Sequence, residues 1–95
     1  MHIQYVGFKA GNGSRDYNFL VKDTPSEHRE FTVTIQMTSF RSTTLKLQDG
    51  PDICFSRLKS ELERETDGAR ASSSLAIEDT DVREFLEKRY PHKRS

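Results

Sequence analysis

The chain has 95 residues, and its 15 lysines and arginines balance 15 aspartates and glutamates, so the formal net charge is zero. A chain of this length forms one domain with a modest hydrophobic core. The zero net charge excludes a global electric field that would draw the protein onto nucleic acid or an anionic membrane, so any such binding has to be local. No apolar run exceeds three residues, whereas a membrane-spanning helix needs about 20.

The N-terminal quarter of the chain predicts a β-hairpin. Two strand-like segments, residues 2–10 and 15–23, flank a Gly-Asn-Gly-Ser sequence at positions 11–14. An Asn-Gly pair supports a tight turn because both residues tolerate positive φ. In the second arm, side chains at alternate positions share one face, namely those of Tyr17, Phe19 and Val21.

A third strand is expected over residues 29–38, after a break at Pro25. Apolar and polar side chains alternate along it, which is typical of a half-buried strand. The apolar set, expected to face the core, is Phe31, Val33, Ile35 and Met37. The polar set, expected to face away from the core, is Thr32, Thr34, Gln36 and Thr38.

Two further segments are candidates for short strands. Residues 44–48 alternate again and predict a short fourth strand, whereas residues 75–77 are apolar and of ambiguous type, with an extended segment docked on the sheet as one interpretation. Between them, the acidic and proline-containing sequence 49–52 favours a helix start. The apolar side of that helix is predicted to contain Cys54, Phe55, Leu58 and Leu62.

A second helix is expected after Thr80, a candidate N-cap, and before Pro91. Its apolar face is predicted to hold Val82, Phe85, Leu86 and Tyr90. The sequence therefore predicts a single α+β domain over residues 1–90, followed by a frayed basic tail at 91–95. The expected architecture is an antiparallel meander of three to four strands with the two C-terminal helices packed on one face.

No arrangement of residues predicts catalysis, a metal site or a cofactor. Cys54 is the only thiol, and it lies at the edge of the apolar side of its helix, which favours a buried structural cysteine over a nucleophile. The histidines are far from it in the sequence and share no metal-ligand spacing; they are His2, His28 and His92. A lone cysteine and the lack of a secretory signal favour a cytoplasmic location.

The polar face of the third strand is the surface that we expect to bind a partner, because one face of such a sheet is left open. The candidate residues are Thr32, Thr34, Gln36 and Thr38, and the expected partner is a protein or a second copy of the chain. The alternative is a nucleic-acid-binding module that uses the basic C-terminal segment. Its candidate residues are Lys88, Arg89, Lys93 and Arg94.

Overall fold

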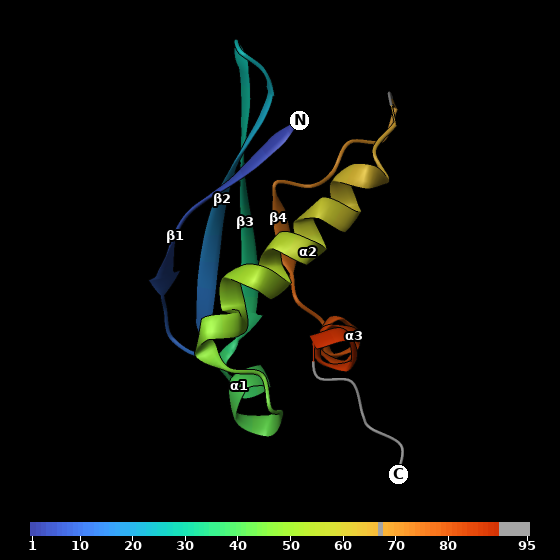
Figure 1. The fold of residues 1–95 in the computed structure, drawn as a ribbon. Coiled ribbons are helices and arrows are strands. Elements are labelled where there is room, and N and C mark those ends of the chain that lie inside the picture. The colour runs from blue at the N-terminus through green and yellow to red at the C-terminus, as the bar shows by residue number, and fades with distance from the viewer. Residues whose placement is uncertain (67, 90–95) are drawn as a thin grey trace.

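The computed structural model describes residues 1–66 and 68–89 and has the α+β architecture that the sequence predicts. Four strands form one sheet in the order β1 (His2–Ala10), β2 (Ser14–Thr24), β3 (Glu27–Gln36) and β4 (Ser74–Ala76). The longest helix, α2 (Gly50–Glu63), crosses one face of the sheet, and α3 (Asp79–Arg89) packs against α2 (Figure 1). We call the face under α2 the inner face and the opposite one the outer face.

The predicted hairpin joins β1 to β2 as an antiparallel pair. Gly13, with φ at 83°, provides the left-handed conformation that the turn requires. On β2, the three alternating apolar side chains are all buried in the core, as expected: Tyr17, Phe19 and Val21.

The register between β1 and β2 shifts between Tyr5 and Gly7, which marks a β-bulge at Val6. On either side of the bulge, Tyr5 lies opposite Phe19 and Phe8 lies opposite Tyr17 in the antiparallel register. The ring centroids of these two pairs are 5.4 and 5.6 Å apart, respectively. The bulge therefore keeps both β1 aromatic rings against the inner-face residues of β2.

The third strand confirms the predicted alternation. Phe31, Val33 and Ile35 face the core with 3%, 0% and 0% of their surface exposed. The strand ends at Gln36, however, and the expectation that it reaches Thr38 with Met37 on the core face is wrong. The last pair of the β2–β3 ladder joins Ser14 to Gln36, and because β2 offers no residue beyond it, the chain turns into the short helix α1 (Met37–Ser42).

The predicted strand at residues 44–48 does not form. Leu45 is buried as a core residue in a loop, and residues 47–49 form the 3₁₀ helix η1 (Leu47–Asp49). No neighbouring strand pairs with this segment among the described residues, so its backbone groups bond locally. The Lys46 amide donates to Asp49 Oδ2 at 3.0 Å, and the Asp49 amide donates to the Lys46 carbonyl at 2.8 Å.

Helix α2 begins at the predicted place, with Pro51 in its first turn. Its buried side is formed by Ile53, Cys54, Leu58 and Leu62. The prediction for Phe55 is wrong, because 39% of its surface is exposed. Helix α2 packs against α3 as well as the sheet, and Ile53 lies on the side toward α3, so the buried side of the helix is turned away from Phe55.

The apolar segment near position 75 is the fourth strand, β4, and it pairs in parallel with β3. The Thr32 amide donates to the Ser73 carbonyl, and the Ile77 amide donates to the Thr34 carbonyl, each at 2.9 Å. The sheet is therefore mixed, and the fully antiparallel meander is wrong in its last strand. The physical reason is the crossover through α2. It returns the chain to the end of the sheet at which β3 begins, so β4 runs in the same direction as β3.

Helix α3 starts at Asp79, just before the predicted N-cap Thr80. The Asp81 carboxylate accepts a 2.8 Å hydrogen bond from the Glu78 amide, which satisfies one of the free amide groups at this end. Val82 is buried, and Phe85 with Leu86 packs at the border of the core. Tyr90 and the predicted tail at 91–95 lie outside the described residues.

Candidate functional site

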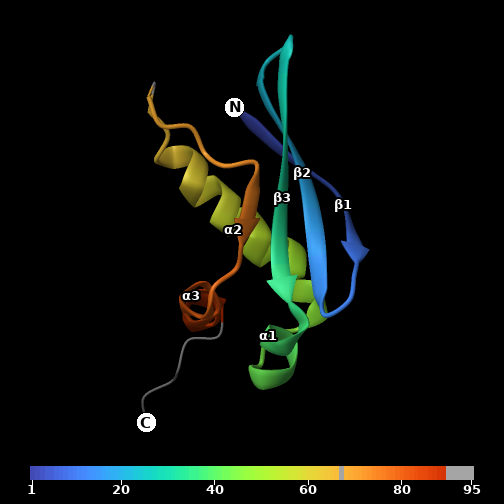
Figure 2. The ribbon, with the colours of Figure 1, turned by 180° about the vertical axis from the view of Figure 1, so that it is seen from behind.

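The outer face of the sheet is a polar surface to which predicted site residues contribute. Viewed from behind, the sheet lies in front of α2, and no described helix crosses its outer face (Figure 2). Thr32 and Thr34 are half-buried on this face, and Gln36 is exposed at the end of β3. These three predicted residues therefore lie together along one strand.

Thr38, the fourth predicted residue, does not belong to this face. The strand has ended at Gln36, and Thr38 is an exposed residue of α1 whose carbonyl accepts a 2.7 Å hydrogen bond from the Ser42 hydroxyl. The alternation of apolar and polar residues continues to position 38. The extended backbone ends at Gln36, so Thr38 does not lie beside Gln36 on the same face.

The neighbouring strand β2 contributes polar partners that the sequence analysis missed. The Thr32 hydroxyl donates to Asn18 Oδ1 at 2.9 Å, and the Thr34 hydroxyl donates to Asp16 Oδ1 at 2.7 Å. These pairs follow the register of β2 and β3, in which each threonine lies directly opposite its partner. The available signal was that Asp16 and Asn18 alternate with Tyr17 and Phe19 along β2, which predicts that they face outward.

A depression of about 280 Å³, lined by both apolar and polar residues, lies at this polar array. Its lining includes Val6 at the bulge of β1 and Leu20 of β2, next to the Asn18–Thr32 pair. The outer face thus combines fixed hydroxyl and amide groups with a small apolar area.

The alternative basic patch is only partly available for a ligand. Lys88 and Arg89 are exposed in the last turn of α3. Arg89 donates to Asp52 Oδ2 at 2.9 Å and lies 3.9 Å from Asp49 Oδ1, so it holds α3 against the start of α2. The other two predicted residues, Lys93 and Arg94, lie outside the described residues.

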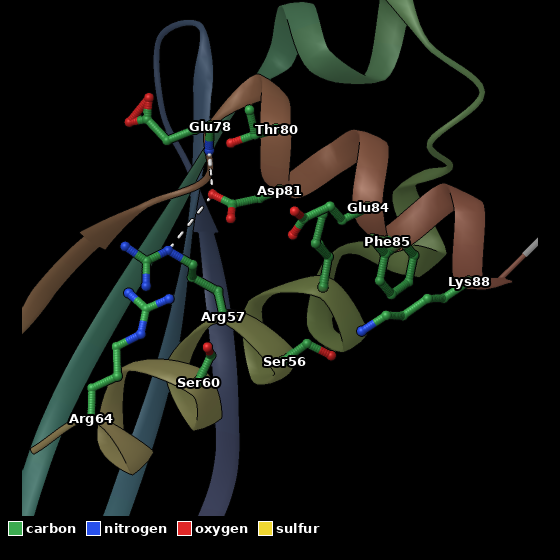
Figure 3. A pocket seen from close by; sticks show the side chains of 11 residues that line it. Ser56, Arg57, Ser60, Arg64, Glu78, Thr80, Asp81, Glu84, Phe85 and Lys88 are labelled. Carbon is green, nitrogen blue, oxygen red and sulfur yellow. Dashed lines mark hydrogen bonds and ion pairs between the residues drawn. The ribbon is translucent and has the colours of Figure 1, made fainter.

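A groove of about 380 Å³ separates α2 from α3 (Figure 3). The figure shows that cationic side chains come mainly from α2 and acidic ones from α3. Arg57 pairs with Glu61 at 2.6 Å and approaches Asp81 to 3.6 Å. The charged side chains lining the groove are balanced: Arg57, Arg64 and Lys88 against Glu78, Asp81 and Glu84. This balance gives the groove no net charge with which to select an anion or a cation.

Cys54 is completely buried on the side of α2 that faces the sheet. Its thiol lies 3.9 Å from the Val33 carbonyl, and burial raises the pKa of the thiol well above its usual range. A neutral thiol without solvent access is a poor nucleophile. The geometry therefore agrees with the structural interpretation of this cysteine.

Among residues 1–66 and 68–89, no three His, Cys, Asp or Glu side chains gather where they could hold a metal ion. None of the helices in this part of the chain combines the length and the apolar character that crossing a membrane requires. A scan against protein-family models and searches of curated proteins and of solved structures each found no match to this chain.

Proposed function

We propose that this chain is a non-enzymatic protein-interaction module whose partner protein covers the outer face of the sheet. The contact residues would be Thr32, Thr34 and Gln36 of β3, together with Asp16 and Asn18 of β2. The observation that carries this proposal is the contrast between the two faces, since α2 buries the inner one and no described element covers the outer one.

The hydrogen bonds on the outer face support binding by a preformed surface. Thr32 and Thr34 are held by Asn18 and Asp16, so their side chains lose little freedom when a partner arrives. Lower ordering entropy increases the affinity that a given set of contacts provides. The backbone beneath them is a regular ladder, which fixes the spacing of the polar groups.

The same proposal has two further parts: the chain has no catalytic role, and it is located in the cytoplasm. The buried, neutral Cys54 supports the first, because it is the chain's sole thiol and its reactive form is disfavoured. The second rests on that lone cysteine, which forms no disulfide within the chain. No cofactor is required for the proposed contacts.

Nucleic-acid binding through the basic C-terminal segment is the second candidate. The observation that favours it is the pair Lys88 and Arg89 at the exposed end of α3, followed in the sequence by Lys93 and Arg94. Against it, the contacts of Arg89 with Asp52 and Asp49 neutralise part of this charge. Binding of this kind would weaken steeply with added salt.

The test compares what the tagged full chain captures from cells with what two sets of variants capture. Thr34→Lys and Gln36→Glu should each lose the partner protein while retaining a cooperative melt, because both side chains lie on the outer face. A tail variant with Lys88→Ala, Lys93→Ala and Arg94→Ala should keep it. This variant spares Arg89 because that residue contacts α2.

Two results would contradict the proposal. Capture of RNA that the tail variant abolishes would establish the nucleic-acid function in its place. Retention of the same protein partner by Thr34→Lys and Gln36→Glu would show that the outer face is not the binding surface.

A further inference from the structure

The chain holds two asparagines, and the fold places them in different surroundings. Asn18 is half-buried in β2, and its Oδ1 atom accepts a hydrogen bond from the Thr32 hydroxyl at 2.9 Å. Asn12 is exposed in the turn between β1 and β2, and Gly13 follows it directly. Within the described part of the chain, no hydrogen bond holds the Asn12 side chain.

An asparagine side chain can react with its own backbone when the following residue allows a close approach. The backbone nitrogen of that residue forms a bond to the asparagine Cγ atom, the Cγ–Nδ2 bond breaks, and the amide group leaves as ammonia with the proton that the backbone nitrogen loses. Water then opens the resulting succinimide ring at either carbonyl and leaves aspartate or isoaspartate. A following glycine favours ring closure, because it has no side chain to block the approach and its backbone adapts most freely.

We propose that Asn12 is a site of spontaneous deamidation in the folded protein. The attacking atom is the Gly13 nitrogen, which makes no hydrogen bond to any described residue, so none has to break before ring closure. A β-carbon at Gly13 would meet nothing within 4 Å, which leaves room for the ring. Both residues are exposed, so water reaches the succinimide and can open it.

A second pair of the same kind shows that the fold decides where this chemistry is possible. Aspartate followed by glycine forms the same ring by losing water, and Asp49 precedes Gly50. Asp49 is completely buried, however, and the Gly50 amide donates to the Leu47 carbonyl where α2 begins. Gly50 also lies against the Tyr17 ring. Ring closure there would break a hydrogen bond and disturb the core, whereas the turn at Asn12 imposes neither cost.

The products change the turn in two ways. Each of them adds a negative charge to a chain whose formal net charge is zero. Isoaspartate also passes the backbone through the side-chain methylene, which lengthens the turn. The Gly13 carbonyl accepts a 2.8 Å hydrogen bond from the Met37 amide, so a longer turn should loosen the contact between the hairpin and the start of α1. The isoaspartyl form, isolated by ion exchange, should therefore melt at a lower temperature than the fresh protein. The inference goes beyond the proposed function, because it concerns the turn and not the outer face.

The test is incubation of the full folded chain at neutral pH and physiological temperature, followed by digestion with trypsin. Trypsin cleaves after lysine and arginine, so Asn12 and Asn18 appear in separate peptides, residues 10–15 and 16–22. Peptide 10–15 should gain the mass difference between a hydroxyl and an amino group, and it should separate into aspartyl and isoaspartyl forms on reversed-phase chromatography. Peptide 16–22 should stay unchanged. Digestion of fresh protein measures the deamidation that the procedure itself causes.

A free peptide with the sequence of residues 10–15 provides the reference rate. The folded chain should deamidate at Asn12 within about tenfold of this peptide, so that folding raises the barrier by no more than about 1.4 kcal/mol. The matched variant is Asn12→Gln, because a glutamine has to close a larger and less favourable ring. The backbone of Asn12 has no positive φ, so glutamine fits the turn. This variant should form no acidic species at position 12 and should keep its melting temperature.

Two results would overturn the inference. Asn12 that keeps its amide in the folded chain while the free peptide reacts would show that the folded turn prevents ring closure. Equal rates at Asn12 and Asn18 would show that the reaction proceeds from the unfolded chain, in which both residues are equally accessible.

Discussion

The two faces of β3 differ in burial and in polarity, although their residues alternate along the strand. Phe31, Val33 and Ile35 lie under α2 and are almost completely buried. On the other side, Thr32 and Thr34 are partly exposed, and their hydroxyls donate hydrogen bonds to neighbouring side chains of the sheet. The inner face therefore carries most of the stability of the domain. Side chains on the outer face can be substituted without unfolding the chain.

The strongest test of this difference is one charge placed on either face. Val33→Asp would bury an unpaired carboxylate in the core, at a cost of several kcal/mol against a total stability of about 5–15 kcal/mol. We expect this variant to be unfolded by circular dichroism and thermal melting. Thr34→Asp, one residue further along the strand, places a second carboxylate opposite Asp16 but leaves it partly solvated, so it should lower the melting temperature modestly and retain a cooperative melt. Equal effects of the two substitutions would contradict the observed strand register.

The next test concerns the close approach of α2 to the inner face. Gly50 lies directly against the ring and hydroxyl of Tyr17, so that a β-carbon at this position would collide with both. Gly50→Ala should therefore destabilise the domain by about 1–3 kcal/mol, as overpacking of a core does. Gly68→Ala is the matched control, because a β-carbon there meets nothing within 4 Å. Urea titration of both variants measures the difference, and equal midpoints would show that α2 does not rest on Tyr17.

A smaller effect is expected at the other end of the inner face, where Arg29 bridges β2 and the end of α2. Its guanidinium donates to Asp23 at 2.8 Å and to Glu65 at 2.7 Å. Arg29→Met should cost about 1–2 kcal/mol at neutral pH, because partly exposed ion pairs contribute modestly. Arg64→Met, which removes a cation with 75% exposure, should have little effect in the same urea titration.

The contribution of Arg29 should depend on pH in a defined direction. The hydrogen bonds from Arg29 and the Ala71 amide lower the pKa of Glu65 from 4.5 to about 2. Because the folded-state pKa lies below the unfolded one, this stabilisation is complete above the unfolded pKa and is lost as the pH falls toward 2. The stability difference between wild type and Arg29→Met should therefore shrink between pH 5 and 2. A constant difference over this range would contradict the pairing of Arg29 with Glu65.

The smallest effect is expected from a reagent that probes the closure of the inner face without changing the sequence. Cys54 lies on the buried side of α2 and its burial raises the pKa of the thiol, so a thiol reagent should label it slowly in the native protein. In denaturant the labelling should be fast. Native labelling at the rate of an exposed thiol would show that α2 opens readily and would revive the thiol as a candidate for chemistry.

Local patterns predicted much of this fold. The alternation of Phe31, Val33 and Ile35, the turn at positions 11–14 and the helix start near Pro51 were all readable, because each depends on the period of the backbone or on the conformational limits of glycine and proline. The candidate surface was readable to the same extent. Thr32, Thr34 and Gln36 lie on the outer face because residues two apart on a strand share a face.

Only the tertiary structure decided which segments meet. The length of β3 depends on where β2 begins, so the position of Thr38 could not be read from its own alternation. The parallel pairing of β4, the exposure of Phe55 and the contact of Arg29 with Glu65 depend on how α2 crosses the sheet. The sequence by itself determined the faces of each element, since these follow from local periodicity. The neighbours of those faces were decided by long-range packing, which no single segment encodes.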